Sequence, residues 1–279
     1  MRSRKLKQLQ GHAARNVLAS RGSLTVVLSH APKDVLAAQK LRYRVFYGEL
    51  RARPDAAARA ARCDRDEFDA FCDHVLVWDR SSSESVVGTY RVLRQEAAAA
   101  RGGFYSQREF DVTPLLTRHP DLRFFELGRA CVLPSYRASP VLELLWQGIW
   151  NYVRFNRIDV MFGCASLEGA DPVAHDRQLS FLAHNFTAPD PWKVRALDSR
   201  YVAMDRLPPG AYDARQTARS LPPLLKGYLR LGCYIGEGAV VDRQFNSTDV
   251  FVIMPVANIK SRYFSRFGSP GETPQLLMS

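Results

Sequence analysis

Short apolar runs bounded by polar residues recur along the first half of the chain and predict strands. Four of these runs have the length of a strand and contain the β-branched and aromatic residues that strands favour. They occupy residues 24–28, 74–78, 86–93 and 124–133. Between the first two, apolar residues recur at helical spacing from Val35 to Val45, behind Pro32, which suits the first turn of a helix. This pattern predicts a helix over residues 33–50.

The second half of the chain begins with its clearest helix signal. Ser139 is a helix N-cap type, Pro140 suits the first helical position, and an apolar stripe runs from Leu142 to Val153. The later pattern predicts two strands and two helices, with the polar segment 210–220 interpreted as a linker. They are a strand at 158–164, a helix at 176–184, a helix at 224–231 and a strand at 250–256.

Alternating strands and helices predict an α/β or α+β architecture, in which helices flank one central sheet. Residues 1–22 form a basic lead-in, and residues 23–279 form one domain, of which about 205–267 is an extension. Residues 51–66 are interpreted as a loop. The connection 94–123 is long, and ordered loops of that length tend to be functional.

Composition and charge narrow the function. With 46% hydrophobic and 24% charged residues, the 279-residue chain has an ordinary globular composition. Its net charge of +11 implies an acidic partner, which could be nucleic acid, an anionic membrane surface or an acidic protein. The five cysteines are dispersed without a CxxC pair, which argues against a disulfide framework and a zinc site, and the histidines show no metal-binding spacing. Without a secretory signal or a run of eighteen apolar residues, we expect a cytoplasmic protein that holds no metal.

Carboxylates crowd one segment of this basic chain. Six of them fall between residues 64 and 79, and they include Asp66 and Asp69. They form either a solvated acidic loop or a site for a cation. Their spacing is not that of a calcium-binding loop, so a cationic amino acid fits better than a metal.

Charged residues also interrupt the apolar run 124–133, at Glu126 and Arg129. Charge inside such a run is costly unless it is paired or used. Glu126 is therefore either half of a structural ion pair or a general base that removes a proton from an attacking amine. Strand alternation predicts that Glu126 and Gly128 share one face, with Leu127 and Arg129 on the other.

The segment that joins this strand to the clear helix offers a second kind of site. A strand-loop-helix junction presents backbone N–H groups to phosphate. Val132, Arg137 and Ser139 lie there and are candidates for contact with a phosphorylated donor. Cys131 and Cys164 have no histidine in a known signature beside them, and we interpret both as core residues.

Several of these residues together resemble a known enzyme family. Arg42 and Phe46 in R-x-x-V-F, Asp66 and Asp69 in D-x-F-D, Arg91, and Glu126 with Arg129 in E-L-G-R resemble the acyl-homoserine-lactone synthases. The fuller resemblance is to a sister family, the hemolysin-like ornithine-lipid N-acyltransferases. It covers roughly residues 35–267, and two C-terminal segments, 221–232 (LPPLLKGYLRLG) and 245–250 (FNSTDV), favour this family.

The resemblance implies a GNAT-fold N-acyltransferase, with a mixed, mostly antiparallel central sheet flanked by helices, and a defined reaction. Such an enzyme transfers a 3-hydroxyacyl chain from the phosphopantetheine of acyl carrier protein to the α-amine of L-ornithine, and holds no tightly bound cofactor. It also implies a catalytic role for Glu126 and Arg129. The substrate would be bound by residues of the shared motifs, which are Arg42, Phe46, Asp66, Asp69 and Arg91.

One departure from general GNAT enzymes bears on the donor. Their glycine-rich phosphate loop is replaced by residues 137–141, which contain no glycine, and Pro140 removes an N–H donor. This loop fits a donor without the CoA pyrophosphate, and the basic surface fits an acidic carrier protein. We also expect peripheral contact with the inner leaflet of the cytoplasmic membrane.

Three alternatives remain open at this stage. The first is the same chemistry on another acceptor, such as lysine, glutamine or a lactone precursor. The second is a membrane-active protein, against which the lack of a spanning or strongly amphipathic segment speaks. The third is nucleic-acid binding, for which only the charge speaks, so we expect no specific nucleic acid among the partners.

Overall fold

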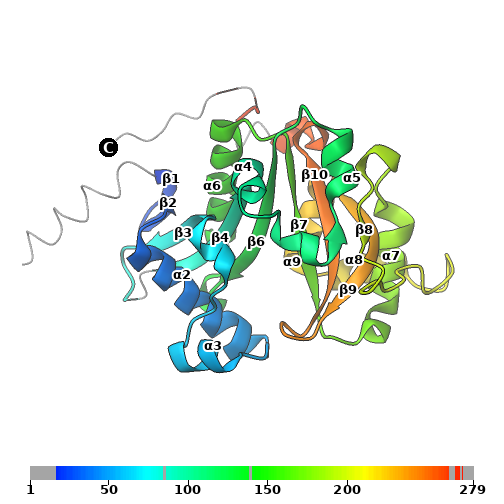
Figure 1. The fold of residues 1–279 in the computed structure, drawn as a ribbon, viewed down its shortest axis with the longest axis horizontal. Helices are drawn as coiled ribbons and strands as arrows, with labels where there is room; N and C mark the ends of the chain where they lie inside the picture. Colours follow the sequence, from blue (N-terminus) through cyan, green and yellow to red (C-terminus); the bar gives the residue numbers. More distant parts are fainter. Residues whose placement is uncertain (1–16, 84–85, 138–139, 264–267, 271, 273–279) are drawn as a thin grey trace, which may run out of the picture.

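One large sheet organises the protein. The structure, a computed structural model, describes residues 17–83, 86–137, 140–263, 268–270 and 272. Ten strands lie in the order β1-β2-β3-β4-β6-β7-β10-β9-β8-β5 (Figure 1). They are β1 (Val17–Arg21), β2 (Leu24–Ser29), β3 (Asp73–Asp79), β4 (Val86–Arg94), β5 (Phe110–Asp111), β6 (Phe124–Val132), β7 (Val160–Glu168), β8 (Arg195–Ala196), β9 (Tyr234–Asp242) and β10 (Ser247–Pro255). Neighbours are antiparallel except β6 with β7 and β8 with β9, which confirms the predicted mixed, mostly antiparallel sheet.

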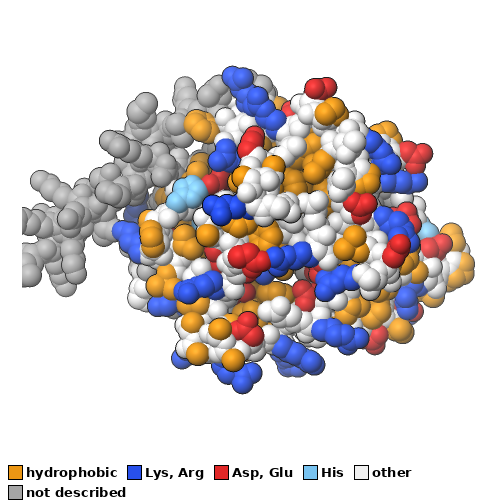
Figure 2. Space-filling view, in the orientation of Figure 1, with side chains coloured by type: hydrophobic (Ala, Val, Ile, Leu, Met, Phe, Trp, Pro, Cys, Tyr) orange, Lys and Arg blue, Asp and Glu red, His pale blue; other side chains and the backbone are white. Residues whose placement is uncertain are grey.

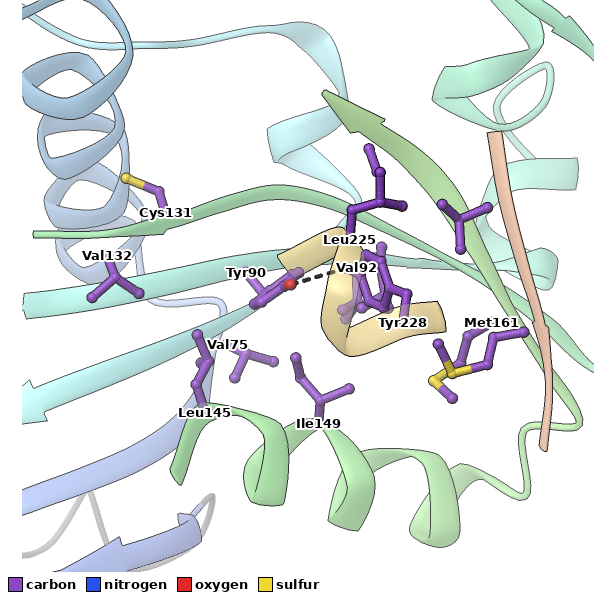
Figure 3. Close-up of a cluster of buried hydrophobic side chains, with 14 of the residues drawn as sticks. Val75, Tyr90, Val92, Cys131, Val132, Leu145, Ile149, Met161, Leu225 and Tyr228 are labelled. Carbon is purple, nitrogen blue, oxygen red and sulfur yellow. Dashed lines mark hydrogen bonds between the residues drawn. The ribbon is translucent and has the colours of Figure 1, made fainter. Parts of the chain in front are cut away.

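Helices cover both faces of this sheet. α2 packs on β3, β4 and β6 and continues into the π-helical segment η1, while α6 packs on β1 to β4. The side chains of two adjacent residues of β6 point to opposite faces of the sheet. The Cys131 thiol contacts the Leu41 carbonyl of α2, and Val132 packs on the opposite face with α6 (Figure 3). The helices are α2 (Pro32–Tyr43), η1 (Arg44–Glu49), α3 (Ala56–Ala61), α4 (Gln95–Ala99), α5 (Thr113–Arg118), α6 (Val141–Asn156), α7 (Asp176–Phe186), α8 (Ala214–Ser220) and α9 (Pro223–Leu231).

The main core lies between the sheet, α6 and α9. Leu145 and Ile149 of α6 are buried against the sheet, as the helical stripe predicted. Tyr228 of α9 reaches the same layer, where its hydroxyl lies 3.1 Å from that of Tyr90 on β4 (Figure 3). Because buried hydroxyls need a partner, this pair fixes α9 against β4. Trp146 and Trp150 of α6 belong to this core and do not line the cavity described below.

Some predicted boundaries were wrong. Residues Val17–Arg21, assigned to the lead-in, form β1, which pairs with β2; residues 1–16 lie outside the described residues. The supposed linker contains α8, whose N-cap Asp213 accepts a hydrogen bond from Gln216. Within the predicted extension, β9 and β10 lie inside the sheet, and β10 overlaps the strand predicted at 250–256. Pro140 is the N-cap of α6, and Ser139 lies outside the described residues.

The strands β6 and β7 form a split in the middle of the sheet. They pair in parallel over only three positions, from Phe124 with Val160 to Glu126 with Phe162. Gly163 follows directly, and a Cβ at this position would lie 2.2 Å from the Leu127 carbonyl oxygen. Glycine is therefore required for the close approach of the two backbones just before they separate.

We expect Gly163→Ala to destabilise the fold by about 1–3 kcal/mol, because the added methyl pushes β6 and β7 apart. Urea denaturation of the purified variant measures this change. Gly227→Ala in α9 is the matched control: nothing lies within 4 Å of its Cβ position. This control should be neutral or stabilising by about 0.5–1 kcal/mol, as for alanine in a helix. Equal stability of Gly163→Ala and the wild type would contradict the close approach.

Candidate active site

A cavity of about 680 Å³ occupies the split between β6 and β7. Residues of β6, β7, the β9–β10 turn and the start of α9 line it. Its apolar lining residues Leu127, Ala165 and Leu167 alternate along the strands with Glu126, Ser166 and Glu168. Strand alternation therefore gives the cavity an apolar side and a polar side. Leu221 and Leu224 also lie on the apolar side.

The polar side carries an excess of negative charge. Five carboxylates and two arginines line the cavity, and both arginines are already paired with aspartates outside it. The carboxylates are Glu109, Glu126, Glu168, Asp242 and Asp249. In a protein of net charge +11, this cavity is an acidic enclosure that suits a cationic ligand.

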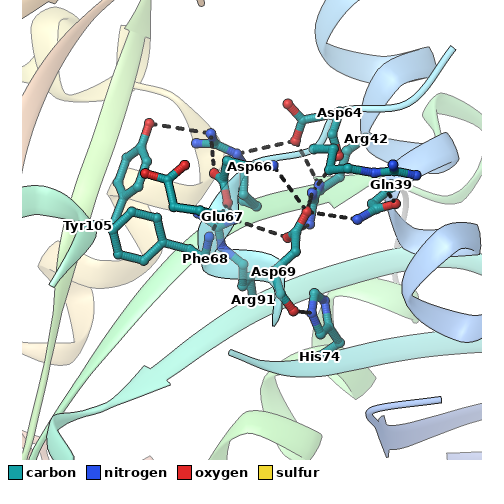
Figure 4. Close-up of polar contacts among 12 residues, drawn as sticks. Gln39, Arg42, Asp64, Asp66, Glu67, Phe68, Asp69, His74, Arg91 and Tyr105 are labelled. Carbon is teal, nitrogen blue, oxygen red and sulfur yellow. Dashed lines mark hydrogen bonds and ion pairs between the residues drawn. The ribbon is translucent and has the colours of Figure 1, made fainter. Parts of the chain in front are cut away.

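Three arginines and three aspartates form a buried network beside the cavity (Figure 4). Arg42 lies at its centre: the Nε donates to Asp64 at 2.7 Å, and two terminal nitrogens donate to Asp69 at 2.7 and 2.9 Å. Arg91 bridges Asp66 and Asp69. Burial opposes ionisation of Asp69, but the hydrogen bonds and charge of Arg42 outweigh it and hold the pKa of that carboxyl below its usual range.

Arg129 completes the network from a β-bulge. In the β4–β6 register Arg91 faces Gly128 and Thr89 faces Cys131, so β6 contains one extra residue between them. Arg129 has a left-handed backbone with φ of 52°. Its Nη2 donates to Asp66 at 3.1 Å, while its Nε lies 3.3 Å from Asp64 without the alignment of a hydrogen bond. Bulges redirect side chains, and this one brings Arg129 to the Glu126 face, contrary to the predicted alternation.

Aromatic rings enclose the Arg129 guanidinium at the cavity wall. Its Cζ lies 4.8 Å from the ring centroid of Tyr105 and 4.5 Å from that of Phe245. Phe46 packs edge-on against Phe245, with ring centroids 5.6 Å apart, and also lines the cavity. These contacts fix the position of Arg129 at the cavity wall.

Glu126 is buried at the floor of the polar side, with 4% of its surface exposed. Its two carboxylate oxygens accept backbone N–H groups of Tyr105 and Ser106, each at 2.8 Å. Burial raises the pKa of this carboxyl above its usual range, although these hydrogen bonds favour the charged form. The donors belong to the long connection 94–123, which therefore fixes the orientation of Glu126.

The sequence is similar to those of known proteins, and these similarities identify its family. Residues 41–147 match the family described as "Acetyltransferase (GNAT) domain". The chain is 50% identical to the L-ornithine N(alpha)-acyltransferase of Brucella abortus, over 91% of this chain and 92% of the relative. The enzymes of the same name from Agrobacterium fabrum and Rhodobacter capsulatus are 49% and 37% identical, over 90% and 86% of this chain and 87% and 93% of theirs.

This chain belongs to the L-ornithine N(alpha)-acyltransferase family. The predicted GNAT fold and N-acyltransferase class are thereby confirmed. Among solved structures, the N-acyl amino acid synthase FeeM from uncultured soil microbes is similar over 86% of this chain and 97% of its own, with 11% identity and a TM-score of 0.49. The acyl-homoserine-lactone synthase LasI covers 83% of this chain and 90% of its own, with 15% identity and a TM-score of 0.43.

In this member of the L-ornithine N(alpha)-acyltransferase family, four predicted site residues line the cavity, namely Phe46, Arg91, Glu126 and Arg129. Arg42, Asp66 and Asp69 lie behind them in the ionic network. Arg137 donates to the Val132 carbonyl at 3.1 Å and pairs with Glu49, at one end of the split, and Ser139 lies outside the described residues. The roles assigned to these residues from the sequence stay predictions.

Of the five cavity carboxylates of this family member, only Glu126 was predicted from the sequence, and the four that were missed include Glu109 and Asp249. Signals for both were present: Glu109 lies in the long connection 94–123, and Asp249 lies in the segment 245–250 that carries part of the resemblance. Cys164 lies next to them, and burial followed by Glu109 and Asp249 raises the pKa of its thiol well above the usual value. Burial likewise raises the pKa of Cys131, so neither thiol is an activated nucleophile.

Among the described residues, no group of three or more His, Cys, Asp or Glu side chains is placed to hold a metal ion. Within the same residues, no helix combines the length and the apolar character that crossing a bilayer requires.

Proposed function

We propose that this protein transfers a 3-hydroxy fatty acyl chain from acyl carrier protein to the α-amine of L-ornithine, which forms lyso-ornithine lipid, the first step of ornithine lipid biosynthesis. The observation that carries the proposal is a cavity with one acidic and one apolar side. An acidic side suits a cationic amino acid, and an apolar side suits an acyl chain. The relatives named L-ornithine N(alpha)-acyltransferase support the same acceptor.

In the proposed reaction, Glu126 acts as the general base. It takes a proton from the α-ammonium, and the freed nitrogen lone pair attacks the thioester carbonyl carbon. The tetrahedral intermediate then collapses, the C–S bond breaks and the C–N bond remains. As the nitrogen becomes an amide it loses a second proton, which protonates the departing thiolate of the phosphopantetheine, and Glu126 releases the first proton to solvent. A buried carboxylate whose pKa is raised is a stronger base than an exposed one, which favours proton uptake from the ammonium.

The bulge of β6 supplies the second part of the mechanism. Between Gly128 and Cys131, two residues lie opposite one on β4, so ladder pairing is interrupted there. A backbone N–H freed from the ladder and directed at the split can donate to the oxyanion of the intermediate. The thioester then lies beside Glu126, with the acyl chain running along Leu127, Ala165 and Leu167.

The donor half of the proposal rests on charge and on the loop after β6. The loop 137–141 contains no glycine, and Arg137 is already paired with Glu49. Figure 2 shows lysine and arginine side chains spread over the face of the protein, where an acidic carrier protein could dock. Because the product is an amphiphile, we propose peripheral contact with the inner leaflet as well.

An assay with purified protein and L-ornithine tests the function. It compares two donors of the same 3-hydroxy acyl chain, one a thioester of acyl carrier protein and the other a thioester of CoA. We expect Nα-acyl-ornithine by mass spectrometry, with kcat/KM for the carrier-protein donor about tenfold or more above that for CoA. This preference should fall as salt is raised, since screening removes the steering of an acidic partner. Equal use of the CoA thioester would overturn the donor assignment. Preferred acylation of lysine, glutamine or a lactone precursor would overturn the acceptor assignment.

A further inference from the structure

A pair of carboxylates lies on the polar side of the cavity, apart from the ionic network. Asp249 of β10 and Glu109, just before β5, line the cavity, and each has 7% of its surface exposed. Asp249 faces Ser166 of β7 across the strand pair, two residues from Cys164. Cys164 and Ser166 share one face of β7, and the Cys164 sulfur lies 3.8 Å from Oε2 of Glu109, so both carboxylates lie on that face.

The negative charge of the pair is incompletely neutralised. Oε1 of Glu109 accepts a hydrogen bond from Arg200 at 2.6 Å, and the Arg200 side chain is 44% exposed. Oδ1 of Asp249 is buried and has no hydrogen-bond partner among the described residues. An acceptor that is buried without a donor costs free energy, and a native site retains it when a ligand supplies the donor.

The electrostatics of the pair agree with a missing cation. Burial, and then the charges of Asp249 and Asp242, raise the pKa of Glu109 to about 7. Burial raises the pKa of Asp249 to about 6, with the charge of Asp242 adding to the rise. The hydroxyls of Ser166 and Ser247 partly oppose this rise in pKa. A positively charged group between these carboxylates would relieve both the desolvation and the mutual repulsion.

We propose that Asp249 and Glu109 bind the side-chain ammonium of the acceptor and thereby direct acylation to its α-amine. The inference rests on the proposed function. An ammonium held by two carboxylates stays protonated and has no lone pair for attack. The α-ammonium, placed at Glu126, loses its proton and becomes the nucleophile. One cavity thus selects a diamino acid and distinguishes its two amines.

The test compares L-ornithine with L-2-aminopentanoate, which has the same chain without the side-chain amine. We expect the wild type to prefer ornithine by about a hundredfold or more in kcat/KM, because the analogue brings no cation to the two carboxylates. Asp249→Asn and Glu109→Gln should each reduce this preference at least about tenfold, mainly through a higher KM for ornithine. Part of the product should shift to the side-chain amide, as NMR of the isolated lipid would show.

Glu67→Gln is the matched control, since it removes the same charge from an exposed carboxylate that does not line the cavity. It should leave the preference unchanged. Thermal unfolding at pH 8 shows whether each variant folds. Asp249→Asn and Glu109→Gln should be no less stable than the wild type at this pH, because each removes a buried charge. Folded variants that keep the wild-type preference would overturn the inference while the proposed function stands. A wild-type protein that acylates no ornithine with any donor would overturn the function itself.

Discussion

Replacement of Glu126 by glutamine should lower kcat by about two to four orders of magnitude, the usual contribution of a positioned general base. The amide is isosteric but takes up no proton from the α-ammonium, so the nucleophile is no longer generated in the cavity. The acidic limb of the pH profile of kcat/KM should disappear together with the activity. Steady-state kinetics with L-ornithine and an acyl carrier protein thioester, from pH 5.5 to 9, measure both effects.

If Glu126 has only a structural role, a different result is expected for the same variant. Its carboxylate accepts two backbone N–H groups, and the amide can accept only one of them without bringing two donors together. That change costs about 1–3 kcal/mol, which thermal unfolding detects. If the variant unfolds at a lower temperature and yet turns over near the wild-type rate, Glu126 only anchors residues 105–106. Glu67→Gln again controls for the loss of one negative charge.

Local patterns predicted the elements that the sheet and its core require. Apolar runs located β2, β3, β4 and β6, and helical periodicity located α2, α6, α7 and α9. The prediction failed where the pattern is weak. The strand β9 contains Gly236 and Gly238, which reduce strand propensity, and each lies where another part of the chain approaches closely. The helix α8 is short and polar, and it was interpreted as a linker for that reason.

The site was less predictable than the fold because it depends on contacts between distant segments. Asp66 and Asp69 were predicted to hold a substrate cation, which stays a prediction, and the structure shows them paired with Arg42, Arg91 and Arg129. The position of Arg129 depends on a bulge, which a period of two residues does not reveal. Glu109 and Asp249 are 140 residues apart in the sequence. The sheet order, which places β10 next to β7, brings Asp249 to the cavity, and Glu109 lies there in contact with Cys164 of β7.

Arg42→Met should destabilise the fold by about 3–5 kcal/mol, the cost of breaking a buried ion pair from one side. Arg42 is fully buried, and its loss leaves Asp64 and Asp69 inside the protein with fewer donors. Because a domain is stable by only about 5–15 kcal/mol, the urea midpoint should fall steeply. Arg59→Met, on the exposed surface of α3, controls for the change of residue type and should shift the midpoint by at most about 0.5 kcal/mol.

A double variant tests whether the Arg42 network stabilises the fold or binds the substrate. If unpaired charge causes the loss, Asp69→Asn should recover part of the stability of Arg42→Met, and the double-mutant cycle should show a coupling of about 0.5–3 kcal/mol. An Arg42→Met protein as stable as the wild type, with only its KM for ornithine raised, would contradict this. That result would instead favour substrate binding by Arg42, Asp66 and Asp69. The ionic network would then share the cation-binding role that the cavity carboxylates are proposed to fill.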